Sequence, residues 1–215
     1  VTAALDAIAR ELGPLDVVIL NAGVNLLRPF TFTPFDDWWR VFEVNLQAPL
    51  MLAHIALQGM RERKRGALVF ISSRAGALSL AGWSAYNVSK TALNRAVACL
   101  QRDLDLEFNN ASGIHMYSIH PGGVKSSMTL GALHPDVEIM QPGFSTGMKN
   151  MYDNFVDTPE LSAWTCVYLA TGRAAALRGR YIDVGDDIED LVCQSDVIRK
   201  ENLYDLTVGT LGGEV

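Results

Sequence analysis

The chain has 215 residues, of which 49% are hydrophobic and 20% charged, a composition typical of a globular protein and not of a disordered one. Its net charge of −6 argues against a nucleic-acid-binding surface, which would require a basic face. No apolar stretch is long enough to cross a bilayer, and the three cysteines and four histidines lack metal-ligand spacing. We therefore expect one domain over residues 1–215, with no membrane span and no metal site.

The cysteines also indicate a compartment. Cys99 and Cys166 lie in apolar helical contexts, so we predict buried, reduced thiols, and no secretory signal peptide is recognisable. Both observations favour a cytoplasmic protein. The basic run Arg61–Arg65 follows a helical pattern and precedes a glycine, so it is interpreted as a helix C-terminus with charges that suit the helix dipole.

The first predicted elements are a helix and a strand. Residues 1–13 carry an apolar stripe at helical spacing and begin without Met and without a capping residue, so we expect further sequence to precede them. Residues 15–20 form a short β-branched run that predicts a buried strand. The strand is followed by Asn21, Ala22 and Gly23, small residues that let a ligand approach the backbone; an ordinary turn at the end of a strand is the alternative.

A long helix is predicted next, from Thr33 and Pro34 to about residue 60. Asn45 lies among apolar neighbours in its middle, and Pro49 leaves the carbonyl of Asn45 without its helical hydrogen bond. A free carbonyl beside a buried amide could hold a water molecule. A structural polar residue at a helix kink explains the same pattern equally well.

The next strand and helix carry the clearest chemical signal. The apolar run of residues 67–71 predicts a buried strand that ends in Ser72 and Ser73, and the following helix places Tyr86 and Lys90 at i and i+4 on one face. An ammonium beside a phenol favours the phenolate, and either serine could hydrogen-bond a carbonyl oxygen that gains negative charge. The alternative is a core tyrosine and a solvated lysine.

The remaining elements complete an alternating pattern. Residues 114–119 predict a strand that ends in a Pro-Gly turn, and residues 129–155 lack a stable period, which indicates a functional loop. A helix from Thr158 and a last strand over 180–184 follow, and the tail 185–215 is expected to be peripheral. Alternating strands and helices predict an α/β fold, a doubly wound parallel sheet in a Rossmann-like three-layer α/β/α arrangement.

In this order the residues resemble the short-chain dehydrogenase/reductase family over nearly the whole chain, and the stretch 167–184 looks most like fungal members. The resemblance is carried by Asn21-Ala22-Gly23, Asn45, Ser73, Tyr86, Lys90, Pro121, Gly122, Val124 and Ser126. It implies that Tyr86 is the acid/base and that Lys90 lowers its pKa and holds the nicotinamide ribose. It also implies that Ser73, and not Ser72, orients the carbonyl and that Asn45 holds a relay water.

The resemblance further implies an NAD(P)-dependent oxidoreductase that acts on a small-molecule alcohol or ketone and forms a homo-dimer or homo-tetramer. The cofactor would be NADP or NAD, with NADP slightly favoured. The cofactor would be lined by Asn21, Ala22, Gly23, Tyr86, Lys90, Pro121, Gly122, Val124 and Ser126. Residues 129–155 would close over an apolar substrate.

One part of the family pattern is missing. No Gly-x-x-x-Gly-x-Gly turn occurs in the chain, nor do the family's first strands, so we expect an N-terminally truncated fold in which residues 15–20 become an exposed edge strand. The favoured explanation is a portion of an ordinary enzyme. The alternatives are a shortened, cofactor-free protein that works by proton transfer, as an isomerase, dehydratase or cyclase, and a non-catalytic remnant.

Overall fold

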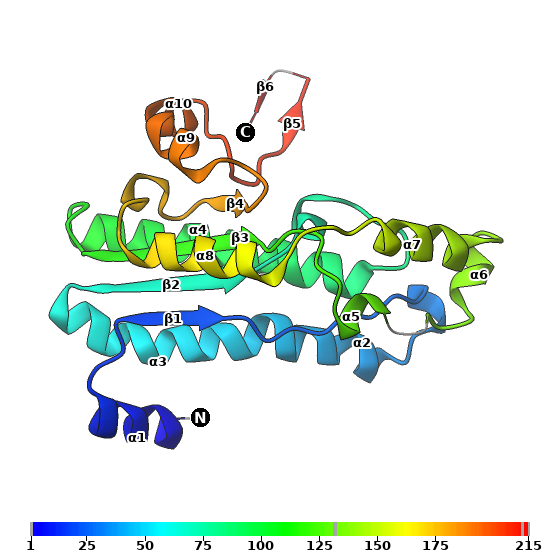
Figure 1. The fold of residues 1–215 in the computed structure, drawn as a ribbon, viewed down its shortest axis with the longest axis horizontal. Helices are drawn as coiled ribbons and strands as arrows, with labels where there is room; N and C mark the ends of the chain where they lie inside the picture. The colour runs from blue at the N-terminus through cyan, green and yellow to red at the C-terminus, as the bar shows by residue number, and fades with distance from the viewer. Residues whose placement is uncertain (1, 131–132, 212, 215) are drawn as a thin grey trace.

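The computed structural model describes residues 2–130, 133–211 and 213–214. A parallel sheet lies between helical layers, as the alternating pattern predicts (Figure 1). In spatial order its strands are β1 (Val17–Leu20), β2 (Gly66–Ile71), β3 (Ile114–His120) and β4 (Tyr181–Asp183). All three pairings are parallel, which confirms the α/β fold class.

The helices are described in chain order. They are α1 (Thr2–Leu12), α2 (Phe35–Phe42), α3 (Ala48–Arg63), α4 (Ser84–Glu107), α5 (Ser127–Leu130), α6 (Val137–Met140), α7 (Phe144–Asp153), α8 (Pro159–Ala170), α9 (Ile188–Cys193) and α10 (Ser195–Lys200). Short 3₁₀ turns occur at Phe30–Phe32, Arg74–Ala77 and Ala175–Leu177, and Glu43–Gln47 forms a π-helix between α2 and α3. Residues Gly209–Thr210 and Gly213–Glu214 pair as a small antiparallel ribbon.

The alternation of side chains along each strand explains why both faces of the sheet are covered. Leu68 and Phe70 of β2 pack in one core cluster with residues of α3 and α4, whereas Val69 packs in a second cluster with residues of α8. Successive side chains of a strand point to opposite faces, so an uninterrupted apolar run is stable only with a layer on each side. The run over residues 67–71 therefore required this three-layer arrangement.

Strand β1 lies at the edge of the sheet, as expected. Its side chains alternate in exposure, because Leu20 is 6% exposed whereas Val17 and Ile19 are 39% and 49% exposed. Leu20 belongs to the core cluster that contains α3 and α4. The opposite face of β1 remains apolar and open to solvent, since α1 is set apart from it in Figure 1.

Two boundaries differ from the predictions. Pro34 is the residue that precedes α2, and Thr33 ends the preceding 3₁₀ turn with its hydroxyl donated to the carbonyl of Pro29. The region 129–155, predicted to be an irregular loop, contains α6 and the ten-residue α7. Phe144, Met148 and Tyr152 follow each other at helical spacing in α7, but the glycines nearby obscured this period in the sequence.

The tail is less peripheral than expected. Leu191 of α9 and Ile198 of α10 are 7% and 4% exposed and belong to the core cluster that contains α8. In addition, the backbone N–H of Tyr181 in β4 donates to the carbonyl of Tyr204. The tail therefore covers the edge of the sheet at β4. The acidic residues before α9 made the tail look like exposed surface in the sequence, so this docking was not predicted.

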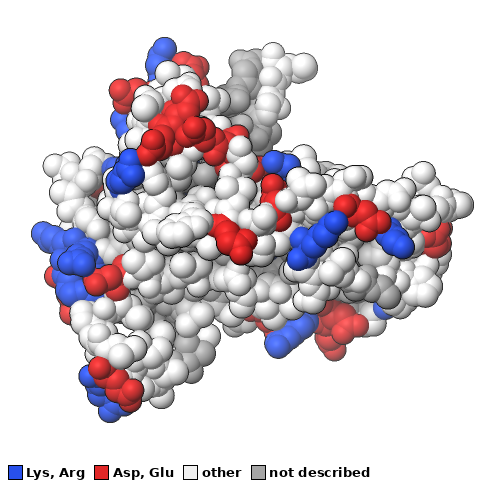
Figure 2. All heavy atoms as spheres, viewed as in Figure 1, with Lys and Arg blue, Asp and Glu red and all other residues white. Residues whose placement is uncertain are grey.

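The surface is mixed in charge. Figure 2 shows acidic side chains gathered near the C-terminal helices and a group of basic side chains at the left edge of the view, with charges of both signs scattered elsewhere. Helix α3 ends at Arg63 with basic residues in its last turn, as predicted. Within the described residues, no helix combines the length and apolarity needed to cross a membrane, and no three His, Cys, Asp or Glu side chains form a metal-binding group.

Candidate active site

The predicted site residues meet at one edge of the sheet. Asn21 follows β1, Ser72 and Ser73 follow β2, and Pro121 follows β3. The three strands are parallel, so their carboxyl ends lie at the same edge, where ligands bind in open α/β folds. Helix α4 runs beside this edge and brings Tyr86 and Lys90 to it.

The two serines point to different surroundings. Ser72 is 2% exposed, and its hydroxyl lies 3.5 Å from the backbone carbonyl of Lys90. The Ser73 hydroxyl accepts a hydrogen bond from the N–H of Ala75 at 3.1 Å, and it lies near enough to the Tyr86 phenol to lower the pKa of that group. Successive residues of an extended chain face opposite sides, so only Ser73 is placed beside Tyr86.

Lys90 is buried beside Tyr86. Its side chain is 3% exposed, and its Nζ donates to the carbonyl of Ile71 at 2.7 Å. The Nζ lies 5.7 Å from the centroid of the Tyr86 ring. Among the described residues, the Ile71 carbonyl is the one acceptor for the three ammonium protons, so Lys90 retains donors that can bind a ligand.

Burial shifts the pKa values of both Tyr86 and Lys90. It raises the pKa of Tyr86, and the neighbouring Ser73 hydroxyl opposes that rise only in part. Burial also lowers the pKa of Lys90 to about 8, because the charged ammonium is removed from water. The raised pKa keeps the Tyr86 phenol protonated at neutral pH. That Lys90 lowers the pKa of Tyr86 stays a prediction.

Asn45 lies in the π-helix between α2 and α3 and is fully buried. Its Oδ1 accepts from the N–H of Val24 at 2.8 Å, and its Nδ2 donates to the carbonyl of Val24 at 2.9 Å and to the Ser89 hydroxyl at 3.2 Å. The predicted irregularity near Pro49 thus takes the form of a π segment, a feature that is frequent at functional sites. The amide anchors the loop that follows β1.

Gly23 lies over Lys90 and Asn45. A Cβ atom at this position would lie 3.6 Å from the Lys90 Nζ and 3.5 Å from the Asn45 Oδ1. A larger side chain would fill the space above the ammonium. This glycine and the spare donors of Lys90 form a cradle that fits the hydroxyl-rich ribose at the nicotinamide end of a dinucleotide.

The turn after β3 is tied to the segment before α8. Gly122 has a φ of +86°, and a Cβ there would lie 2.7 Å from Oδ2 of Asp157, so both conformation and space require glycine. The same oxygen accepts from the N–H of Gly123 at 2.6 Å, and Val124 forms a bridge with Asp157. Ser126 is exposed, and its carbonyl accepts from the N–H groups of Thr129 and Leu130 at the end of α5.

The structure adds residues that sequence reasoning missed. Ser89 is fully buried, and its hydroxyl donates to the carbonyl of Tyr86 at 2.8 Å while it accepts from Asn45. A small polar residue on the buried face of a helix was the available signal. Arg28 pairs with Asp136 at 2.7 Å, which links the loop after β1 to the segment that carries α6.

Comparisons with known proteins agree with this geometry. A family model described as short chain dehydrogenase matches residues 1–135. A short chain dehydrogenase of Pseudocercospora fijiensis is 29% identical over 95% of this chain, and the short chain dehydrogenase pigC of Monascus ruber is 34% identical over 89%. A solved short-chain dehydrogenase from Streptomyces avermitilis, 25% identical, covers 93% of this chain and 71% of its own with a TM-score of 0.67.

The chain spans only part of these relatives. It covers 67% of the length of the Pseudocercospora fijiensis protein and 58% of pigC. The matched part contains β2, α4 and β3, and thus the residues that meet at the carboxyl edge of the sheet.

Proposed function

The chain belongs to the short chain dehydrogenase family, and from that premise we propose that it is an NAD(P)-dependent oxidoreductase that interconverts a carbonyl compound and its alcohol. The observation that carries this proposal is the placement of the Tyr86 phenol next to the Ser73 hydroxyl, beside the buried Lys90. Together they supply an acid and a hydrogen-bond donor at one place. A carbonyl oxygen needs both when the carbonyl group is reduced to an alcohol.

Tyr86 would act as the acid. Because burial raises its pKa, the phenol is protonated at neutral pH and can give its proton to the carbonyl oxygen as negative charge develops there. The Ser73 hydroxyl would hold the same oxygen and orient it toward the phenol. This arrangement favours carbonyl reduction at neutral pH, while alcohol oxidation would require the phenolate and therefore a higher pH.

A bound nicotinamide cofactor would supply the hydride that such a reduction needs. Lys90 would hold the ribose hydroxyls with the protons that Ile71 does not accept, and Gly23 would leave the space for them. The cradle would continue along Asn21 and Ala22 on one side and Pro121, Gly122, Val124 and Ser126 on the other. Asn45 would fix the loop after β1 and support a relay water. NADP remains slightly favoured over NAD.

The substrate would be an apolar alcohol or ketone enclosed by the region 129–155. A Cβ at Gly82 would lie 2.7 Å from the Cε of Met140 and 2.9 Å from Leu27, so α6 packs directly on the loop before α4. Trp83 lies edge-on to Tyr86, with ring centroids 6.3 Å apart. Apolar side chains therefore surround the approach to the phenol.

Substitution of Tyr86 by Phe tests the proposal. Tyr86→Phe removes the proton donor but keeps the ring, so carbonyl reduction should fall about 10²- to 10⁴-fold. The affinity for NADPH, measured by calorimetric titration, should stay nearly unchanged. Tyr168→Phe, a half-buried tyrosine of α8 in the other helical layer, is the matched control and should keep full activity. Undiminished turnover in Tyr86→Phe would remove Tyr86 from its role.

A second candidate function uses the same two residues. Tyr86 and Ser73 could catalyse proton transfer alone, as in an isomerase, dehydratase or cyclase. Titration of the chain with NADPH and with NADH separates the two proposals, because clear binding of either would reject the cofactor-free one. A chain that binds neither dinucleotide, yet loses an isomerase activity in Tyr86→Phe, would favour it.

We also propose that the protein forms a homo-dimer or homo-tetramer through its long helices. Met51 of α3 and Val88 of α4 are 43% and 49% exposed, which is high for large apolar side chains on two neighbouring helices. Light scattering coupled to size-exclusion chromatography should report more than one copy. The substitution Val88→Glu should shift the particle toward the monomer mass.

A further inference from the structure

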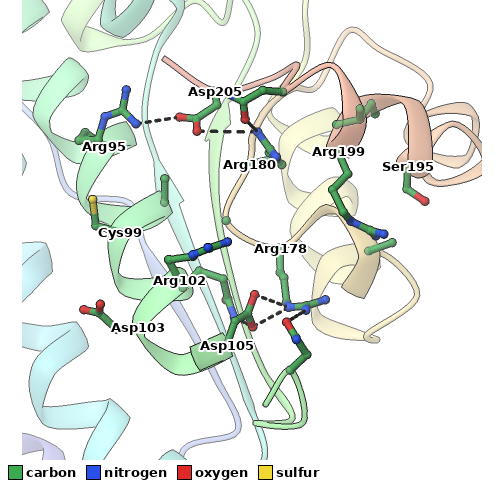
Figure 3. A pocket seen from close by; sticks show the side chains of 17 residues that line it. Arg95, Cys99, Arg102, Asp103, Asp105, Arg178, Arg180, Ser195, Arg199 and Asp205 are labelled. Atoms are coloured by element: carbon green, nitrogen blue, oxygen red, sulfur yellow. Dashed lines mark hydrogen bonds and ion pairs between the residues drawn. The ribbon is translucent and has the colours of Figure 1, made fainter. Parts of the chain in front are cut away.

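A cavity lies away from the carboxyl edge of the sheet, between α4 and the C-terminal helices. Figure 3 shows it, and its volume is about 460 Å³. Three segments far apart in the sequence build its walls: the outer face of α4, the stretch before and into β4, and α10 with the residues after it. Each of the three contributes arginine. They are Arg95, Arg102, Arg178, Arg180 and Arg199.

The aspartates that line the cavity do not neutralise these arginines. Asp105 accepts from the Arg178 Nε at 2.8 Å, and Asp205 is shared by Arg95 at 3.3 Å and Arg180 at 3.8 Å. Asp103 points to the side of α4 away from Arg178 (Figure 3). Five arginines and three aspartates thus line the pocket of a protein whose net charge is −6.

Two guanidinium groups on opposite walls remain available. Within the described residues Arg102 has no hydrogen-bond or ion-pair partner, and Figure 3 shows it extending from α4 toward the segment of Arg178. Arg199 is paired only with Asp196 at 3.4 Å, and the Asp196 side chain is 96% exposed, so water screens that pair. Burial lowers the pKa of Arg180, and Asp205 opposes this shift. Arg199 lowers the same pKa further, because the two guanidinium cations repel each other.

A smaller cavity of about 220 Å³ adjoins the first, since Gly179 and Asp205 line both. Asn94 is 6% exposed and lines this inner cavity, yet neither polar atom of its amide has a hydrogen-bond partner among the described residues. Tyr181 lines the cavity as well, and within the same part of the chain its buried hydroxyl also has no partner. Buried polar groups without partners are costly, so these groups are placed to bind a polar molecule.

We propose that this arginine-lined pocket binds a small multivalent oxyanion, a molecule with phosphate or carboxylate groups whose uncharged polar part enters the inner cavity beside Asn94 and Tyr181. Guanidinium groups bind phosphate and carboxylate in a bidentate manner, and opposing walls suit a ligand with two charged ends. Such a ligand would relieve the repulsion among the arginines and fasten α10 to α4.

Calorimetric titration of the full chain with pyrophosphate and with citrate tests the proposal, at constant ionic strength set with chloride. The unmodified protein should bind at least one of them, and the stronger ligand identifies phosphate or carboxylate as the preferred group. The double variant Arg102→Gln, Arg199→Gln should bind at least 10-fold more weakly. The double variant Arg40→Gln, Arg173→Gln removes the same charge from exposed surface pairs outside the pocket and should bind as the unmodified protein does.

Alkylation of cysteine locates the ligand. Cys99 is exposed and lines the pocket, whereas Cys193 is exposed but lies outside it. The bound anion should slow alkylation of Cys99 by iodoacetamide and leave Cys193 unchanged, as peptide mass spectrometry can measure. Lack of binding of either anion, equal weakening in both double variants, or equal rates at Cys99 with and without ligand would overturn the proposal.

Discussion

At the scale of single residues, the site depends on how burial changes proton affinity. Lys90 is 3% exposed and has a pKa of about 8, so keeping its ammonium charged in the folded protein costs free energy. Burial moves the pKa of Tyr86 in the opposite direction, upward, because it disfavours the charged phenolate and keeps the phenol protonated. The two shifts together hold a proton on Tyr86 and leave Lys90 close to its midpoint near neutral pH.

The depressed pKa of Lys90 predicts a pH dependence of stability. In the unfolded chain Lys90 binds its proton below a pKa of 10.5, whereas in the folded chain it does so only below about 8. The unfolded state therefore binds more protons between these values, and stability rises with pH through that window. Relative to Lys90→Met, the free energy of unfolding of the unmodified protein should rise by about 2 kcal/mol between pH 7.5 and pH 9.5.

Urea denaturation of both proteins at the two pH values measures this difference. The Lys90→Met variant removes only this titration, so shifts from other groups cancel in the comparison. A stability gap that is the same at both pH values would show that Lys90 keeps an ordinary pKa in the folded protein.

Asn45 predicts a structural effect that is separate from any relay water. Asn45→Ala leaves the N–H and the carbonyl of Val24 without their partners, so stability should fall by about 2–4 kcal/mol. Gln58→Ala, which removes an exposed amide from the helix that follows, should change stability by less than about 0.5 kcal/mol. Chemical denaturation compares them, and equal small effects would contradict the anchoring role of Asn45.

At the scale of elements, β1 combines an apolar face with an open edge. Val17 and Ile19 are exposed on the face of β1 opposite α3, and strand edges of this kind pair with other chains. Helix α1 does not cover them in Figure 1. Aggregation of the chain on heating, as distinct from assembly through its helices, should therefore begin at this strand.

The variant Ile19→Lys tests that expectation, because a charge on an edge strand opposes strand pairing. Light scattering during mild heating should show a later onset of aggregation than in the unmodified protein. Leu106→Lys places the same charge at an exposed leucine of α4, which is not in the sheet, and should have a smaller effect. A larger delay in the α4 variant would locate the association elsewhere.

At the scale of the whole molecule, the tail helps to close the fold. Leu191 and Ile198 bring α9 and α10 into the core cluster that contains α8, and this docking also builds the third wall of the arginine-lined pocket. The stability of the sheet edge at β4 and the shape of the pocket thus depend on the same contacts.

Ile198→Ala measures that contribution. The side chain is 4% exposed, so truncation should cost about 3 kcal/mol through lost burial and a residual cavity. Val197→Ala removes an adjacent side chain that is 51% exposed and should cost less than about 1 kcal/mol. Similar losses in both variants, measured by thermal unfolding, would mean that α10 is not held in the core.

Local patterns in the sequence were enough to determine the fold class and the group of residues at the edge of the sheet. The apolar run of residues 67–71 required a covered strand, and the spacing of Tyr86 and Lys90 required one helix face, since both depend on near neighbours in the chain. The helix α7 was missed because glycines obscured its period, and Cys99, predicted to be buried, is exposed.

Only the tertiary structure decided what depends on burial and on distant segments. It separated Ser73 from Ser72 and showed that burial raises the pKa of Tyr86, because desolvation is set by the surrounding chain and not by local spacing. It also brought together arginines from α4, from the segment before β4 and from α10, which are too far apart in sequence to form a visible cluster. The candidate catalytic residues are thus recognisable from local sequence, whereas their proton affinities and the arginine-lined pocket arise from packing.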